Sequence, residues 1–382
     1  MANRIMLNET SYHGAGAIQE IATEAKAHGF QKAFVCSDPD LIKFGVTKKV
    51  TDVLDKNGLV YEIYSDIKPN PTIQNVQHGV QAFKDSGADY LIAIGGGSSM
   101  DTSKAIGIII ANPEFEDVRS LEGVAPTKKP CVPIIAVPTT AGTAAEVTIN
   151  YVITDVEKKR KFVCVDPHDM PIIAIVDPEM MSSMPKGLTA STGMDALTHA
   201  MEAFLNLFAS RSVQNASIEA VCENFHALPE AWRDGTHLAA RQEMLHASYL
   251  AGFAFTNNFV GYVHAIAHAV GALYHIPHGR ANAVLLPAVL REYGSCIAPK
   301  LAVLADALSL GGDTVSEKAE RMIAAIEAMR DSFDIPSTLP HLSPNDYTEI
   351  ARRALKEANP TYPVPQIWDS EKIFSVLRRV QS

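Results

Sequence analysis

The sequence predicts an α/β domain in residues 1–184, followed by an all-α domain in residues 185–382. Three observations lead to this fold class. Short apolar runs rich in β-branched residues alternate with amphipathic stretches up to about residue 180, as in a parallel sheet covered on both faces. After Pro185 helical patterns take over and strand-like runs nearly vanish. The length of 382 residues suits two domains.

The strands of the first domain are expected at short apolar runs. These runs occupy residues 32–38, 61–67, 88–94, 132–138 and 172–178. Amphipathic stretches at 41–58 and 72–87 lie between the earlier runs, as helices lie between parallel strands. Residues 148–155 and 160–166, separated by a short charged stretch, predict an inserted β-hairpin.

The second domain is expected to consist of long helices. Their patterns cover residues 189–208, 240–255, 262–274 and 316–333. Apolar residues recur there at the spacing of three or four that one helix face requires. The change of pattern places the domain boundary between Met184 and Pro185.

Composition excludes several classes of protein. A formal net charge of −10 disfavours binding to nucleic acid, whose phosphates would repel the chain. No apolar run is long enough to span a bilayer, and the N-terminal residues lack the apolar core of a signal peptide. The five cysteines are scattered and never in CxxC spacing, which indicates free thiols in a reducing cytoplasm.

A glycine-rich loop follows the buried run at residues 88–94. Gly95, Gly96 and Gly97 precede Ser98, and a helix is expected to begin near Asp101. Glycines let the backbone approach a pyrophosphate, and a helix N-terminus offers unpaired N–H groups and partial positive charge. The segment therefore predicts a nucleotide-binding loop in a Rossmann-like domain. The alternative is a plain strand–turn–helix corner, with a solvated Lys104 one turn further on.

Two further segments suit a dinucleotide. Asp38 ends the first predicted strand, where a carboxylate can accept from ribose hydroxyls and repel a 2′-phosphate, which favours NAD over NADP. The same residue also fits as the N-cap of a helix that begins at Pro39. Residues 138–143, PTTAGT, carry three hydroxyls after another buried strand, and they suit either phosphate and ribose binding or a capped helix start.

The second domain carries a predicted metal site. Asp195 and His199 are four apart on a predicted helix, so their side chains share one face. His264 and His268 repeat this spacing, and His278 follows in a Pro-His-Gly turn. A carboxylate and several imidazoles form a ligand set for a divalent transition metal. Each pair alone would also fit a local hydrogen bond or buried imidazoles, and the convergence of three segments favours the metal.

The kind of metal is narrowed by the absence of thiolates. No cysteine falls in these segments, so a thiolate zinc site is excluded, while Fe(II), Zn(II), Mn(II), Co(II) and Ni(II) all suit the donors. Glu202 lies seven residues after Asp195, on the same helix face. It suits either a residue that orients a metal ligand or an ordinary solvated glutamate, and we expect the latter.

Taken together, these segments resemble the iron-dependent (group III) alcohol dehydrogenase family. The resemblance lies in GGGSSMDTSK, PTTAGTAAE, DALTHAME, GYVHAIAH and YHIPHG, and it spans the whole chain. It implies the fold of that family, which dehydroquinate synthase shares. It also implies NAD, Fe(II) with Zn(II) as a competitor, a cytoplasmic homodimer, and hydride transfer between NAD(H) and a small alcohol or aldehyde.

The resemblance also implies roles for individual residues. The metal ligands would be Asp195, His199, His264 and His278. The NAD-binding residues would be Asp38, Asn70, Gly96, Gly97, Ser98, Asp101, Thr139, Thr140, Thr143 and Lys161. The residue that passes a proton beside the nicotinamide would be His268. The substrate pocket would be lined by Thr148, Asn150, Val163, Phe255, Phe259 and Val260.

The expected substrate is a short 1,2-diol or its hydroxyaldehyde, such as 1,2-propanediol or lactaldehyde. Residues 1–199 resemble the 1,2-diol oxidoreductases of the family, whereas the later part is more generic, as in a recombined chain or a lineage that diverged in one half. Phe259 stands where those relatives have glycine, so the pocket would be narrower. The alternatives are a glycerol-type polyol dehydrogenase, a butanol-type dehydrogenase, a lyase of the same fold, and an NAD-binding sensor.

Overall fold

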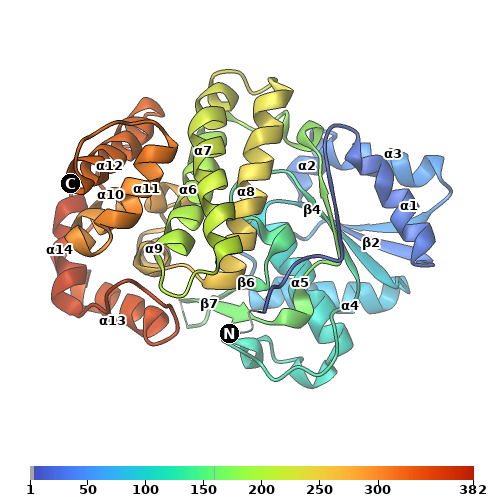
Figure 1. The fold of residues 1–382 in the computed structure, drawn as a ribbon. Helices are drawn as coiled ribbons and strands as arrows, with labels where there is room; N and C mark the ends of the chain where they lie inside the picture. The colour runs from blue at the N-terminus through green and yellow to red at the C-terminus, as the bar shows by residue number, and fades with distance from the viewer. Residues whose placement is uncertain (1–3, 159) are drawn as a thin grey trace. The chain divides into compact units, whose positions relative to one another are not determined.

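The computed structural model describes residues 4–158 and 160–382 (Figure 1). The chain forms two compact units. One contains Ile5–Met184 and Thr236–Tyr249, and the other is built mainly from Pro185–Gly235 and Leu250–Ser382. The two-segment division expected from the sequence did not anticipate that residues 236–249 pack with the α/β unit. The reason is long-range contacts, since the hydroxyl of Tyr249 donates to Asn8 (2.8 Å) and its ring meets that of His13 edge-on.

The α/β unit is organised around a parallel sheet, as the sequence predicts. The sheet has six strands in the order β1-β8-β5-β4-β2-β3. Their bounds are Thr10–His13 (β1), Lys32–Ser37 (β2), Val60–Tyr64 (β3), Tyr90–Gly95 (β4), Ile134–Pro138 (β5) and Ile173–Val176 (β8). Strand β1 was not predicted, because no apolar run marks it in the sequence; it pairs in parallel with β8. The hairpin is also present, as the antiparallel pair β6 (Asn150–Asp155) and β7 (Arg160–Val165).

Both faces of the sheet are covered by helices, which explains why the central strands read as continuous apolar runs. The helices of this unit are α1 (Glu20–Ala27), α2 (Pro39–Lys43), α3 (Val46–Lys56), α4 (Ile73–Ser86) and α5 (Gly97–Ala111). Alternate residues of one strand enter different cores. Phe34 packs in a cluster with residues of α4 and α5, whereas Val35 packs in a cluster with residues of α1 and α3.

The second unit is all helical, as expected. Its helices are α6 (Lys186–Leu205), α7 (Arg211–Arg233), α9 (Tyr262–Tyr274), α10 (His278–Tyr293), α11 (Ala298–Ala307), α12 (Val315–Ser332), α13 (Tyr347–Ala358) and α14 (Ser370–Val380). Helix α8 (Leu238–Asn258) begins in the α/β unit and ends in this one. Helix α6 packs against α7 and α10, and α9 packs against α10 and α13. No helix in the described part of the chain is both long and apolar enough to span a membrane.

Short 3₁₀ helices connect these elements. They span Ala17–Gln19 (η1), Pro113–Phe115 (η2), Val118–Leu121 (η3), Ala145–Val147 (η4), Pro167–Asp169 (η5), Pro178–Met181 (η6), Gly294–Cys296 (η7) and Pro344–Asp346 (η8). The segment between η4 and β6 is held by Lys104 of α5, which contacts Thr148 and Asn150, two of the predicted pocket residues.

Lys104 of α5 is buried, and the solvated position considered from the sequence is wrong. Its ammonium group donates to the carbonyls of Thr148 and Asn150 and to the hydroxyl of Thr148 (3.1 Å). The carboxylate of Asp169 lies 3.7 Å away, and burial raises the pKa of that carboxyl group to about 8 against the attraction of Lys104. A single cation therefore ties the segment Thr148–Asn150 to α5.

Replacing this lysine tests its structural role. The Lys104→Met variant should unfold with a free energy lower by about 3–5 kcal/mol, because the buried acceptors lose the cation that pairs with them. Urea unfolding followed by circular dichroism measures the change. Lys84→Met, on the exposed face of α4, is the matched control and should be nearly neutral. Equal stability of the two variants would contradict the assignment.

Candidate metal centre and nucleotide-binding loop

The predicted metal ligands come together from three helices of the helical unit. Asp195 and His199 lie on α6, His264 lies on α9, and His278 is the first residue of α10. Oδ1 of Asp195 is 3.6 Å from Nε2 of His264 and 3.4 Å from Nε2 of His278. Ligand atoms of Asp195, His199 and His264 all lie within 4.8 Å of one another. A tetrahedral ion with bonds of about 2.1 Å holds its ligand atoms about 3.4 Å apart, so these distances suit one ion.

A glycine allows α10 to approach α6 closely enough for this geometry. A Cβ atom on Gly279 would lie 2.1 Å from the backbone carbonyl oxygen of Ser191 and 3.4 Å from Cβ of Asp195. Any side chain at this position would push the two helices apart. The Pro-His-Gly turn thus combines a predicted ligand, His278, with the glycine that brings it close to Asp195.

The electrostatics of the donor set favour positive charge at its centre. Burial opposes ionisation of Asp195, but the imidazoles of His199, His278 and His264 hold its pKa well below the usual value. Burial lowers the pKa of His278 well below its usual value, against the attraction of Asp195. Burial also opposes protonation of His264, yet Asp195 and Glu202 raise its pKa to about 9. The centre therefore attracts positive charge.

Asn282 marks the point on which the donor atoms converge, and the sequence analysis missed it. Its Nδ2 donates to Oδ1 of Asp195 (2.6 Å) and lies 3.2 Å from Nε2 of both His264 and His278. The hydrogens of the amide NH2 group carry partial positive charge, so the donors fit around a positive group. The signal in the sequence was the spacing of four between His278 and Asn282 on one helix.

His268 lies beside the donors and is held by two residues that sequence reasoning also missed. Its ring stacks on that of His278, with centroids 5.1 Å apart. Its Nδ1 lies 2.8 Å from a carboxylate oxygen of Glu357, and the same oxygen accepts from the hydroxyl of Tyr362 (2.9 Å). Because Glu357 is 89 residues further along the chain than His268, no local sequence pattern could predict that the two residues pair.

Aromatic side chains form one side of the centre. The ring of Phe255 stacks on that of His199 at 4.3 Å, and Phe255 belongs to an apolar cluster that includes Val260. Phe259 is 43% exposed, has a φ of 62°, and lies 6.1 Å from the ring of Tyr362. Phe255 thus contacts the predicted ligand His199 and packs with Val260, whereas Phe259 lies next to Tyr362.

The predicted nucleotide loop joins β4 to α5 in the α/β unit. Gly95 has a φ of 147°, and Gly96 precedes the first turn of α5 with no side-chain cap, so the first N–H groups of this helix form the kind of N-terminus at which anions bind. A Cβ on Gly96 would lie 3.1 Å from Oγ1 of Thr140, and a Cβ on Gly97 would lie 3.1 Å from Thr143. The loop after β5 is therefore packed against the glycine loop, and a side chain at either position would crowd it.

The remaining predicted cofactor residues have local partners in the same unit. Asp38 caps α2 by accepting from the N–H groups of Asp40 and Leu41 (both 2.9 Å), which is the alternative role considered for it. Lys161 donates to Oδ1 of Asn70 (2.5 Å). Asp101 accepts from the N–H of Val152 (3.1 Å), and burial raises its pKa to about 7.

The other predicted residues of this unit occupy loop ends and the hairpin. Ser98 lies in the first turn of α5, Thr139 directly follows β5, and Thr148 precedes β6. Asn150 pairs with Val165, whereas Val163 pairs with Val152, so these two predicted pocket residues lie on opposite strands two pairs apart.

Comparison with known proteins gives one consistent result. Residues 8–178 match the family described as iron-containing alcohol dehydrogenase, and residues 189–381 match the C-terminal part of the Fe-containing alcohol dehydrogenase family. The chain is 48% identical over 347 residues to lactaldehyde reductase of Escherichia coli, covering 90% of this chain and 89% of that one. Among solved structures, a 1,3-propanediol oxidoreductase superposes with a TM-score of 0.95 at 36% identity, covering all of both chains. A sulfoacetaldehyde reductase from Bifidobacterium kashiwanohense, solved with NAD+, gives a TM-score of 0.89 at 26% identity, covering 100% of this chain and 99% of that one.

Metal content tests the candidate centre. Purified protein stripped with a chelator and reloaded with Zn(II) or Fe(II) should retain about one ion per chain after dialysis. His264→Ala and His278→Ala should each retain far less, because each removes one imidazole from the donor set. Elemental analysis measures the retained metal. His78→Ala removes a histidine whose side chain is 71% exposed, and it should match the wild type. Equal metal retention by all variants would contradict the assignment of His264 and His278 as metal ligands.

Proposed function

The chain belongs to the iron-containing alcohol dehydrogenase family, and from this membership we propose that it is an NAD-dependent, metal-dependent oxidoreductase of small alcohols, diols and their aldehydes. The observation that carries the proposal is the convergence of Asp195, His199, His264 and His278, with donor distances that suit one ion. His268 beside them supplies a group that exchanges protons.

We propose Fe(II) as the resident metal, held by Asp195, His199, His264 and His278. Zn(II) competes for the same donors, because its intrinsic affinity for nitrogen and oxygen ligands is higher. We propose NAD as the second cofactor, bound at Asp38, the glycine loop and the threonines after β5. Support comes from the uncapped start of α5 and from the related reductase solved with NAD+.

The proposed mechanism assigns a task to each group of side chains. A metal held by Asp195 and the imidazoles would supply Lewis acidity for the substrate oxygen, and bound NAD would supply or accept the hydride. Asp195 and the imidazoles of His199, His264 and His278 provide the donor atoms that would bind the metal. His268 passes a proton between substrate and solvent, and Glu357 together with Tyr362 orients its ring. Phe255 and Val260 keep water from one side of the centre.

The substrate that we favour is a short 1,2-diol or the corresponding hydroxyaldehyde. The support is the 48% identity to a lactaldehyde reductase over most of the chain. Phe259 would restrict the length of the substrate, because its half-exposed ring stands next to Tyr362. We further propose a cytoplasmic homodimer. The free state of all five cysteines suits a reducing compartment.

Activity should depend on both metal and NAD. In a 340 nm assay with 1,2-propanediol, stripped protein should be inactive, and reloading with Fe(II) should restore turnover with NAD more efficiently than with NADP. Zn(II) should compete with Fe(II) for the site. His264→Ala should bind NAD yet show no turnover, which separates an enzyme from an NAD sensor. Turnover without metal, or a clear preference for NADP, would refute the proposal.

The role of Phe259 in substrate choice has its own test. Phe259→Gly should raise kcat/KM for a longer diol relative to 1,2-propanediol by about tenfold, because removing the ring frees space for extra methylene groups. Folding should be preserved, since the φ of 62° suits glycine. Phe208→Gly is a matched control with a φ of 64° and a ring that is 89% exposed. An unchanged substrate preference in Phe259→Gly would contradict the placement of this residue in the substrate pocket.

A further inference from the structure

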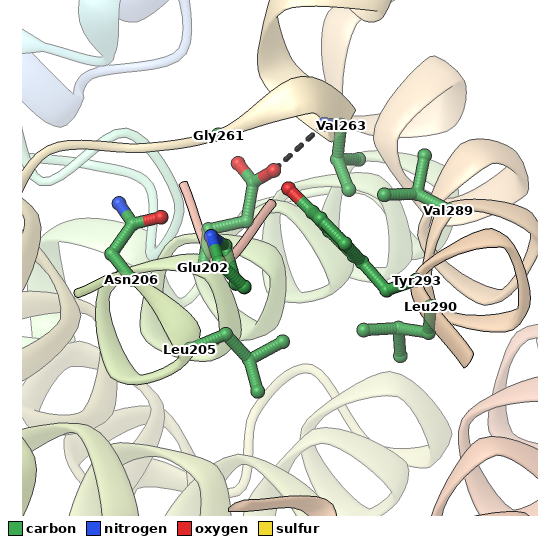
Figure 2. Close-up of a pocket in the computed structure, with 9 residues that line it drawn as sticks. Glu202, Leu205, Asn206, Gly261, Val263, Val289, Leu290 and Tyr293 are labelled. Atoms are coloured by element: carbon green, nitrogen blue, oxygen red, sulfur yellow. Dashed lines mark hydrogen bonds between the residues drawn. The ribbon is translucent and has the colours of Figure 1, made fainter. Parts of the chain in front are cut away.

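Glu202 is buried behind the candidate metal centre, and the solvated role expected from the sequence is wrong. It lies on α6, and its two carboxylate oxygens have different partners on α9. Oε2 is 2.6 Å from Nδ1 of His264, and Oε1 accepts from the backbone N–H of Val263 (2.7 Å). Figure 2 shows the second of these bonds as a dashed line. The carboxylate is therefore fixed at both oxygens.

Gly261 makes room for this carboxylate. A Cβ at this position would lie 2.8 Å from Oε1 and 3.3 Å from the carboxyl carbon of Glu202. The backbone of Gly261 has φ −142° and ψ −150°, so the residue does not need the left-handed region. Space for Glu202 accounts for the glycine, and Figure 2 shows the two residues side by side.

The surroundings of Glu202 are mainly apolar. A small cavity next to the carboxylate is lined by Glu202, Leu205, Asn206, Gly261, Val263, Val289, Leu290, Tyr293 and Pro365. In such low-dielectric surroundings, a hydrogen bond between a carboxylate and an imidazole is stronger than it would be in water. The bond to His264 is thus an effective constraint on that ring.

The chemical consequence falls on the ring of His264. A carboxylate that accepts at Nδ1 keeps the hydrogen of the neutral imidazole on Nδ1 and leaves the lone pair on Nε2. Nε2 is the atom that faces Asp195, at 3.6 Å. We propose that Glu202, with the space that Gly261 provides, is a positioning residue that fixes the tautomer and orientation of His264 for metal binding.

The competing explanation is purely structural. Glu202 also accepts from Val263 in the first turn of α9, so it caps that helix whether or not a metal binds. The two explanations differ in what a variant loses. A cap contributes to the stability of the metal-free protein, whereas a positioning residue contributes to the affinity for the ion.

Glu202→Gln tests the proposal, because glutamine has one acceptor oxygen for two N–H groups. Competition of the metal-free protein with a coloured chelator should give a Kd for Zn(II) that is about 10–100-fold higher than that of the wild type. The visible absorption bands of the Co(II)-loaded protein should also shift, because the ring of His264 is no longer held. The urea midpoint of the metal-free protein should stay close to that of the wild type, although the Kd for Zn(II) rises.

Gly261→Ala is the second variant, and it leaves the carboxylate in the protein. The added methyl group should displace Glu202 and raise the Kd for Zn(II) in the same direction. Gly187→Ala, also on the helical unit, is the matched control, because a Cβ there meets no atom within 4 Å. The double variant Glu202→Gln with Gly261→Ala should bind little worse than Glu202→Gln alone, since both changes break one contact.

The outcomes separate this inference from the proposed function on which it rests. If the wild type binds no metal, the proposed function fails and the inference fails with it. If the wild type binds Zn(II) while both variants keep its Kd within about twofold, the inference alone is overturned. If Glu202→Gln does not fold, Gly261→Ala against Gly187→Ala decides the question, since Gly261→Ala keeps the charged carboxylate in the protein.

Discussion

The buried carboxylate of Asp195 is the constraint on which the helical unit depends. A buried anion is tolerated only when partners of opposite charge or hydrogen-bond donors surround it. The chain provides His264 and His278 at 3.6 and 3.4 Å, together with the amide of Asn282 at 2.6 Å. Because these partners come from α9 and α10, the carboxylate on α6 determines how the three helices meet.

Close helix contact at this point requires small residues rather than large ones. Gly279 lets α10 approach the backbone of α6 at Ser191, and Gly261 lets the start of α9 approach Glu202. In both places the glycine is next to a predicted metal ligand or one turn from it. The two glycines therefore affect the candidate metal centre by letting helices lie close together, since each lacks a side chain that would separate them.

The sequence could predict the parts of this structure that rest on local patterns. The i, i+4 spacing of Asp195 and His199 and the apolar runs of the parallel sheet are examples, because helix and strand periodicity express themselves over a few residues. Glu357 could not be found in this way, since its contact with His268 spans 89 residues. Lys104 was misplaced for the same reason: its burial depends on carbonyls more than forty residues away.

The number of carboxylates around His264 bears on the charge of the metal ion that the centre would bind. Asp195 and Glu202 each contribute one negative charge, and both lie within hydrogen-bonding or ion-pair distance of that imidazole. A divalent cation with neutral imidazoles balances these two carboxylates, whereas a trivalent ion leaves one buried positive charge without a partner, which is unfavourable in a low-dielectric site. Neutral Gln at position 202 would leave one positive charge unbalanced even with a divalent ion. If the proposed metal binds here, the charge of Glu202 would favour a divalent ion, in addition to the role proposed for Glu202 in orienting His264.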